Sequence, residues 1–159
     1  MITAEGYQSF VTQLYFTGDD YITKDPSSAS PNAKKRILDI QTLNDGTKKV
    51  SYDVSMSPKL AAETAVIDKL TGVYMDEKDK NNKMEFFKKD NLLWMKNEIF
   101  GEDYECIGSN TFQYPNAPQG MSLTLLFEII PQSAVKVTKT YVDEKGEKHI
   151  NVAVKIMKE

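Results

Sequence analysis

Alternating apolar and polar residues dominate this 159-residue chain and predict a protein built mainly from β-strands. The first such stretch runs from Gln8 to Phe16, and a loop rich in Gly, Asp, Ser and Pro follows it over residues 18–31. Two further runs, ILDIQTL and KVSYDVSM, flank Asn44-Asp45-Gly46, whose Asp-Gly pair tolerates the positive φ angles of a tight turn. We therefore expect a β-hairpin over residues 37–56.

The pattern changes at Pro58, a residue that suits the first turn of a helix. Apolar residues recur with helical spacing from there to residue 70, and Gly72 ends the segment. Short strand-like runs separated by turn residues fill the rest of the chain: VYMDE, KMEFFKK, LLWMKN, YECIGSNTFQY, SLTLLFEII, VKVTKTYVDE and HINVAVKIM. Strands at this spacing favour an antiparallel meander that curls into a small β-barrel or half-barrel.

The last strand-like run alternates most clearly, with Ile150, Val152, Val154 and Ile156 on one face. One face of that strand is therefore expected to be buried. Because no internal repeat marks a boundary, we divide the chain where its pattern changes, into residues 1–57 and residues 58–159.

Composition and charge argue against some classes of binding partner. The chain is 40% hydrophobic and 27% charged, as in ordinary globular proteins. Its net charge of -3, with no cluster of Lys and Arg, argues against binding to nucleic acid. No signal peptide or apolar run of membrane-spanning length is visible, so we expect no membrane partner and a cytoplasmic location.

Cys106 is the only cysteine, which excludes an internal disulfide and a Cys-based zinc site. Its setting in YECIG favours a small buried apolar residue over a reactive thiol. Asp76, Glu77 and Asp79 lack the glycine and the final glutamate of a calcium-binding loop, so a solvated turn is expected there.

One motif in the first quarter of the chain resembles a known family. The order Gly6-Tyr7, Thr12 to Phe16, Gly18-Asp19 and Asp25-Pro26 is similar to the stretch that follows the iron-binding histidines of intradiol ring-cleavage dioxygenases. The resemblance implies that residues 1–57 are a remnant of a dioxygenase-like β-sandwich. Gln13 matches a family glutamine near the metal and substrate, although a hydrogen-bonding role within a strand is the interpretation we favour.

The same resemblance implies which residues would bind iron. That family holds Fe(III) with two tyrosines and two histidines, and its H-x-H pair would fall immediately before Met1. His149 is the sole histidine and lies near the other end of the chain. We therefore expect no catalytic residue, metal ligand or cofactor in this chain, and Fe(III) only if an upstream region supplies the ligands.

Two interpretations of function stay open. In the first, the chain is a non-catalytic C-terminal part of a dioxygenase-like protein, with a structural, dimerisation or small-molecule-binding role. In the second, it is part of an iron enzyme that cleaves catechol-like rings, and the region that carries the metal ligands is missing. A sandwich that has lost strands would expose an open edge, which a longer natural chain, a second copy of this chain or the second β region would cover. The second of these alternatives predicts a homodimer.

Residues 58–159 are similar in pattern to small β-barrel domains appended to bacterial hydrolases and to lipocalin-like barrels. A pocket lined by Trp94, Phe112 and Tyr114 would accept an apolar or aromatic small molecule, because small barrels can enclose one ligand. The alternative, which we favour, is that these rings form the core of the domain.

Overall fold

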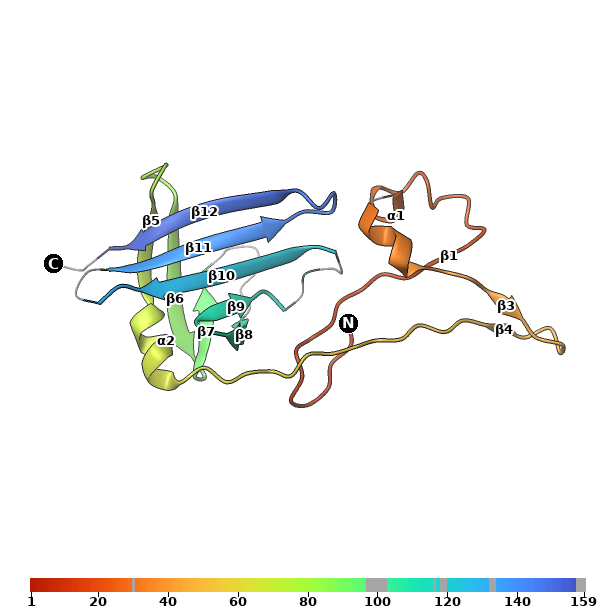
Figure 1. Ribbon diagram of the computed structural model, residues 1–159, viewed down its shortest axis with the longest axis horizontal. Coiled ribbons are helices and arrows are strands. Elements are labelled where there is room, and N and C mark those ends of the chain that lie inside the picture. Colours follow the sequence, from red (N-terminus) through yellow and green to blue (C-terminus); the bar gives the residue numbers. More distant parts are fainter. Residues whose placement is uncertain (30, 97–102, 116, 118–119, 132–133, 157–159) are drawn as a thin grey trace.

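The computed structural model describes residues 1–29, 31–96, 103–115, 117, 120–131 and 134–156. Eight antiparallel strands close into a barrel, and the chain before it forms only short elements. Figure 1 shows this preceding part to one side of the barrel, with the hairpin of β3 (Gln41–Thr42) and β4 (Lys48–Lys49) farthest away. The predicted mainly-β fold, with an antiparallel barrel and a short leading helix, is confirmed.

The barrel is a simple up-and-down meander, because each strand pairs with its sequence neighbours and the last strand pairs with the first. Its strands are β5 (Gly72–Asp76), β6 (Lys83–Lys89), β7 (Leu92–Met95), β8 (Asp103–Gly108), β9 (Thr111–Gln113), β10 (Ser122–Ile129), β11 (Val135–Val142) and β12 (Lys148–Lys155). Pairing of β12 with β5 closes the sheet and so removes its free edges.

Tight turns with left-handed residues join two of the hairpins. Asp90 and Asn91 link β6 to β7 with φ of 51° and 60°, and Ser109 and Asn110 link β8 to β9 with φ of 44° and 56°. Asn and Asp tolerate this region better than most residues, and paired positive φ angles match the twist of the flanking strands. The single strand predicted over residues 104–114 is therefore two strands.

The leading helix α2 (Thr64–Leu70) begins six residues later than Pro58, where the sequence predicted its first turn. Ile67 and Leu70 are buried against the barrel core, and the backbone N–H of Thr71 donates to the Ile67 carbonyl at the end of the helix. Within the described residues, no helix combines the length and the apolar character that a membrane crossing requires.

Aromatic rings fill the barrel. Phe127 packs edge-on against Tyr74, Phe86 and Phe112, with ring centroids 5.8, 5.2 and 5.9 Å away. Such edge-to-face contacts add to the free energy gained by burying the rings. Leu93, Leu125 and Val137 complete this layer and are fully buried.

Strand β12 turns its less apolar face inward. Ala153 is fully buried, whereas Ile150 is 56% exposed and Ile156 is 37% exposed. Ala153 pairs with Asp76 on one side and with Val137 on the other, and all three are buried. The buried face that the sequence predicted is thus limited in β12 to Ala153, which lies on the face opposite the Ile and Val residues.

The loop between β5 and β6 is anchored by a buried carboxylate, so the predicted solvated turn is only partly right. Asp76 is 6% exposed and accepts the backbone N–H groups of Lys78 and Asp79, at 2.6 and 3.1 Å. The side-chain amides of Asn82 and Asn151 donate to its other oxygen. The N–H groups of Lys78 and Asp79 lower the Asp76 pKa below its ordinary value of 3.8.

This contact predicts a pH-dependent effect of Asp76→Asn on the free energy of unfolding. Because the folded state lowers the pKa, the ionised carboxylate stabilises the protein above pH 4, and this stabilisation is lost as the pH falls through the folded pKa. Urea denaturation should show a constant gap between the wild type and Asp76→Asn from about pH 7 to about pH 5, and a narrowing gap below about pH 4. Asp79→Asn, which removes the same charge from the same loop, is the matched control. If the difference in free energy of unfolding between the wild type and Asp76→Asn stays constant down to about pH 2, the lowered pKa of Asp76 is contradicted.

The chain before the barrel has little core of its own. Its elements are β1 (Tyr15–Phe16), α1 (Pro26–Ala29), the 3-10 helix η1 (Pro31–Arg36), β2 (Ile37–Leu38), β3 and β4. β1 pairs with β2 in parallel, and β3 with β4 across the predicted turn at Gly46, where φ is 82°. Residues 1–57, which were predicted to be a β-sandwich remnant, contain two separate two-stranded sheets among their described residues, with strands much shorter than expected.

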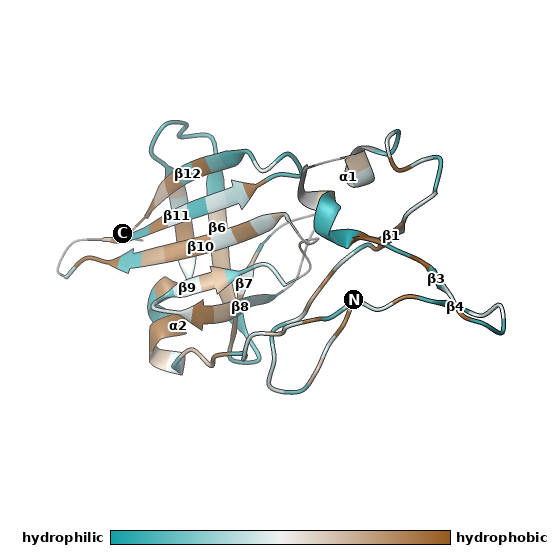
Figure 2. Ribbon diagram, turned by 45° about the vertical axis from the view of Figure 1, so that its right-hand side comes forward, coloured by the Kyte–Doolittle hydropathy of each residue, from teal (hydrophilic) through white to brown (hydrophobic). Residues whose placement is uncertain are grey.

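Many large apolar side chains of this part are exposed. Figure 2 shows hydrophobic stretches along it, away from the barrel. Among the described residues before Pro58, Ala33 is the one apolar residue in the buried class. The exposed large apolar residues there are Met1, Ile2, Tyr7, Leu14, Phe16, Tyr21, Ile40, Leu43 and Val50. A segment with so little buried apolar surface is not expected to be stable by itself.

Candidate functional site

A cleft opens in the barrel wall where β7 and β8 separate. Among the described residues, the two strands pair through Leu93 with Tyr104 and Trp94 with Asp103, so β7 does not pair with β8 beyond Tyr104. Residues 59–63, which we call the roof, lie over this gap, and Leu60 forms a single antiparallel bridge with Cys106 of β8. The cleft is therefore a consequence of short strand pairing and is covered by the segment that precedes α2.

The walls of the cleft are mainly apolar. Its larger hollow has a volume of about 330 Å³, and a neighbouring hollow of about 320 Å³ shares Leu60, Ala61, Ala62, Cys106 and Phe112 with it. Ile67, Leu93 and Tyr104 line the larger hollow from α2, β7 and β8. This volume is at the small end of the range for sites that bind small molecules.

The lining of the larger hollow includes the polar residues Lys59, Asp90, Asn91 and Glu105. A thiol and a phenol lie among its less polar residues. The Cys106 thiol is part-exposed and lines both hollows. Burial raises the pKa of the Tyr104 hydroxyl well above its ordinary value of 10.0, so this phenol stays neutral and donates weakly to the Met95 sulfur at 3.9 Å. An apolar wall with a thiol and a neutral phenol suits binding of an uncharged or aromatic molecule.

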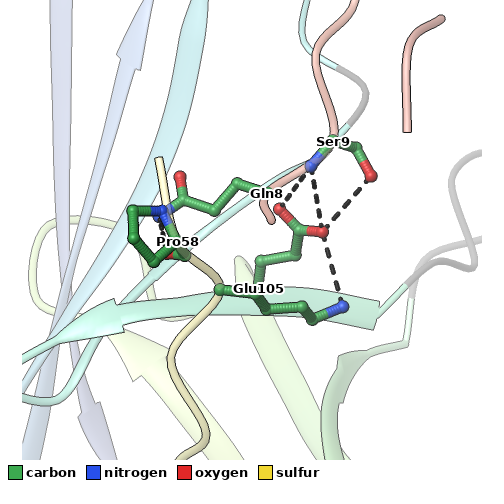
Figure 3. A network of polar contacts seen from close by, with 5 residues as sticks. Gln8, Ser9, Pro58 and Glu105 are labelled. Carbon is green, nitrogen blue, oxygen red and sulfur yellow. Dashed lines mark hydrogen bonds and ion pairs between the residues drawn. The ribbon is translucent and has the colours of Figure 1, made fainter. Parts of the chain in front are cut away.

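The outer face of β8 carries a buried carboxylate, Glu105, which is one of the residues that line the larger hollow. Glu105 points away from the core, yet only 3% of it is exposed, because the start of the chain crosses over it. Ser9 donates its backbone N–H to both carboxylate oxygens, at 3.3 and 3.2 Å, and its hydroxyl to one of them at 3.3 Å. Figure 3 shows Ser9 beside the Glu105 carboxylate. Lys59 of the roof adds an ion pair with Glu105 at 3.4 Å.

Of the predicted pocket residues, Phe112 and Tyr114 lie on the core side of the barrel wall and Trp94 lies on its outer side. Phe112 is 1% exposed in the core and lines the cleft, and Tyr114 lies near Tyr104, with ring centroids 6.1 Å apart. Trp94 alternates with the buried Leu93 and Met95 and so faces outward, where it stacks on Phe87 at 6.2 Å. Lys89 lies over the Trp94 ring, 4.9 Å from its centroid.

Gln13, the residue matched to the dioxygenase family, is exposed in the segment before the barrel. Its side-chain carbonyl accepts a hydrogen bond from the Tyr15 hydroxyl at 3.0 Å. This contact fits the hydrogen-bonding role that the sequence favoured.

Sequence analysis missed the roof and Glu105 as parts of a site. The signal for Glu105 was an acidic residue in the middle of a strand, between Tyr104 and Cys106. Cys106 was predicted to be buried; it packs against the core but is only half-buried, and it lines the cleft. The alternation of inward and outward side chains in β8 was visible in the sequence. The residues that cover its outer face, Ser9 and Lys59, are far from β8 in the sequence, so the local pattern could not show them.

A second cluster of chemical groups lies at the hairpin between β11 and β12. Asp143, Glu147 and His149 bring one ligand atom each to within 4.8 Å of the others. His149 contacts Asp143 at 3.0 Å and lowers the pKa of that carboxyl. The other Asp143 oxygen accepts the N–H groups of Lys145 and Glu147 at 2.9 Å each, so the turn itself accounts for the cluster.

Comparison with known proteins gave no match: no family model, curated protein or solved structure resembles this chain. The dioxygenase and lipocalin-like resemblances therefore stay predictions from sequence.

Proposed function

We propose that this chain is a non-catalytic binding module that holds a small apolar or aromatic molecule in the cleft beneath the roof. The observation that carries the proposal is the apolar cleft itself, formed where β7 and β8 stop pairing and lined by Leu60, Cys106 and Phe112. The resemblance of the first residues to intradiol dioxygenases supports a role as the C-terminal part of such a protein, with the barrel appended to it.

Titration with the aromatic probe anilinonaphthalene sulfonate (ANS) tests the cleft, because ANS fluoresces on binding apolar surface. Ala61 lines both hollows, so Ala61→Phe should fill the site and weaken ANS binding at least about tenfold. Ala65→Phe, on an exposed position of α2 outside the lining, is the matched control and should bind as the wild type does.

The control also separates the cleft from the exposed apolar residues before Pro58, which can bind ANS too. Only the component of binding that Ala61→Phe removes and Ala65→Phe retains belongs to the cleft. Equal affinity in the two variants would rule the cleft out as the site.

We also propose that the chain forms a homodimer, which would cover apolar residues before Pro58. Phe16 is 40% exposed and Leu43 is 44% exposed, and they are two of nine exposed large apolar side chains among the described residues before Pro58. Exposed apolar surface beyond that of a typical monomer marks an interface. Light scattering at micromolar concentration should give twice the 18.0 kDa of one chain. Replacement of Leu43 by Asp should shift the mass toward the monomer, and a monomeric wild type at that concentration would contradict the proposal.

A further inference from the structure

We infer that residues 6–9, which we call the strap, hold the roof closed and control access to the cleft. This inference rests on the proposed function, because it concerns the regulation of the same site. The strap is distant from the roof in the sequence, and the structure places the two side by side (Figure 3).

Backbone contacts tie the strap to the chain that leads into the roof. The Gln8 N–H donates to the Ser57 carbonyl at 2.9 Å, and the Lys59 N–H donates to the Gly6 carbonyl at 2.8 Å. These two bonds flank the antiparallel bridge between Tyr7 and Pro58. The Gln8 side chain adds a bond to the Pro58 carbonyl at 3.1 Å.

Glu105 fixes both segments to the barrel. It accepts from Ser9 of the strap and pairs with Lys59 of the roof, so one carboxylate on β8 contacts both segments. The bridge between Leu60 and Cys106 attaches the roof to β8 at a second point. Charge-assisted hydrogen bonds to a buried carboxylate are stronger than neutral ones. Loss of this carboxylate should therefore release the strap and the roof together.

The strap should detach from the barrel at a lower free energy than the barrel core unfolds. Tyr7 is 47% exposed and Leu60 is 46% exposed, so neither segment buries much apolar surface. Segments held mainly by a few hydrogen bonds open locally at a lower free energy than the core. Gly6 lines the larger hollow, so movement of the strap alters the cleft directly.

The reactivity of the Cys106 thiol can be used to detect opening of the roof in the absence of any ligand. It is the only cysteine, it lines both hollows, and Leu60 of the roof bridges to it. Cys106 is half-buried beneath the roof, so the rate of its alkylation by iodoacetamide, followed by intact mass, measures access to the thiol, which opening of the roof increases. The rate for the chain unfolded in urea gives the upper limit.

The test compares Glu105→Gln with Glu85→Gln, which removes the same charge from an exposed ion pair with Lys96 elsewhere on the barrel. Glu105→Gln should raise the alkylation rate about tenfold, the effect of one charge-assisted hydrogen bond, and Glu85→Gln should leave it unchanged. Ser9→Pro, which deletes the N–H that Glu105 accepts, should also raise it. Ser9 lies outside the barrel strands, so circular dichroism should show the barrel intact in this variant.

Unchanged alkylation in both Glu105→Gln and Ser9→Pro would overturn the inference even if ANS binds in the cleft. Faster alkylation in both variants, together with ANS binding that Ala61→Phe does not weaken, would establish an opening strap and refute the proposed ligand site. Faster alkylation in both, with faster ANS association in Glu105→Gln than in Glu85→Gln, is the result we expect.

Discussion

Phe127→Ala should lower the free energy of unfolding by about 3–5 kcal/mol, the usual cost of removing a large aromatic side chain from a packed core. Phe127 is 2% exposed and contacts three other rings, so its loss leaves a cavity that its rigid neighbours cannot fill. Urea denaturation monitored by circular dichroism gives the value directly.

The adjacent residue supplies the control. Leu126 is 42% exposed, and along a strand successive side chains point to opposite faces, so Leu126→Ala should cost less than about 1 kcal/mol. Similar losses for the two variants would mean that β10 does not have the register in which Phe127 faces the core.

Gly72→Ala should lower the free energy of unfolding by about 1–3 kcal/mol, because its backbone adopts a conformation that an L-residue rarely occupies. Gly72 has φ of 131° where the chain leaves α2 and enters β5. A Cβ added there would also lie 2.8 Å from the Lys155 side chain.

A double variant separates these two causes. Lys155 is flexible and donates to the Lys69 carbonyl at 2.8 Å, so Lys155→Ala removes the close contact at the cost of that bond. If the backbone conformation is the cause, Gly72→Ala should cost nearly as much in the Lys155→Ala background as in the wild type. A penalty that vanishes in this background would assign the effect to the side-chain contact instead.

Much of the barrel could be predicted because its strands and turns are specified locally. The runs VYMDE, KMEFFKK and SLTLLFEII lie on β5, β6 and β10 almost without shift. Their boundaries follow from turn residues that accept positive φ, such as Asp90 and Asn91. The break between β8 and β9 had the same signal in Gly108-Ser109-Asn110, which the sequence analysis absorbed into one strand.

The start of α2 could not be predicted from local pattern. Pro58 favours a helical first turn, but its carbonyl bonds to Gln8, and the next N–H, that of Lys59, bonds to Gly6. Contacts with the first residues of the chain therefore hold this stretch extended until Glu63, whose ψ is 137°. The same contacts create the roof, so the error in the helix boundary and the missed site have one cause.

The sequence also could not predict which face of a uniformly apolar strand points into the barrel. LLWM is apolar throughout, so alternation could not tell whether Trp94 or its neighbours Leu93 and Met95 face inward. In β12, the face with Ile150 and Ile156 is the more apolar one and yet lies outside. Strand register in a closed barrel is set by all eight strands together, which no single run of sequence contains.

Ligand protection of Cys106 tests the central claim, that the cleft beneath the roof is a binding site, most directly. Iodoacetamide labelling of this single thiol is measured by intact mass while ANS is raised through its dissociation constant. If ANS occupies the cleft, the labelling rate should fall in step with ANS occupancy in the wild type and in Ala65→Phe, and should not respond in Ala61→Phe. ANS that binds to the wild type while the labelling rate of Cys106 stays constant would contradict the claim.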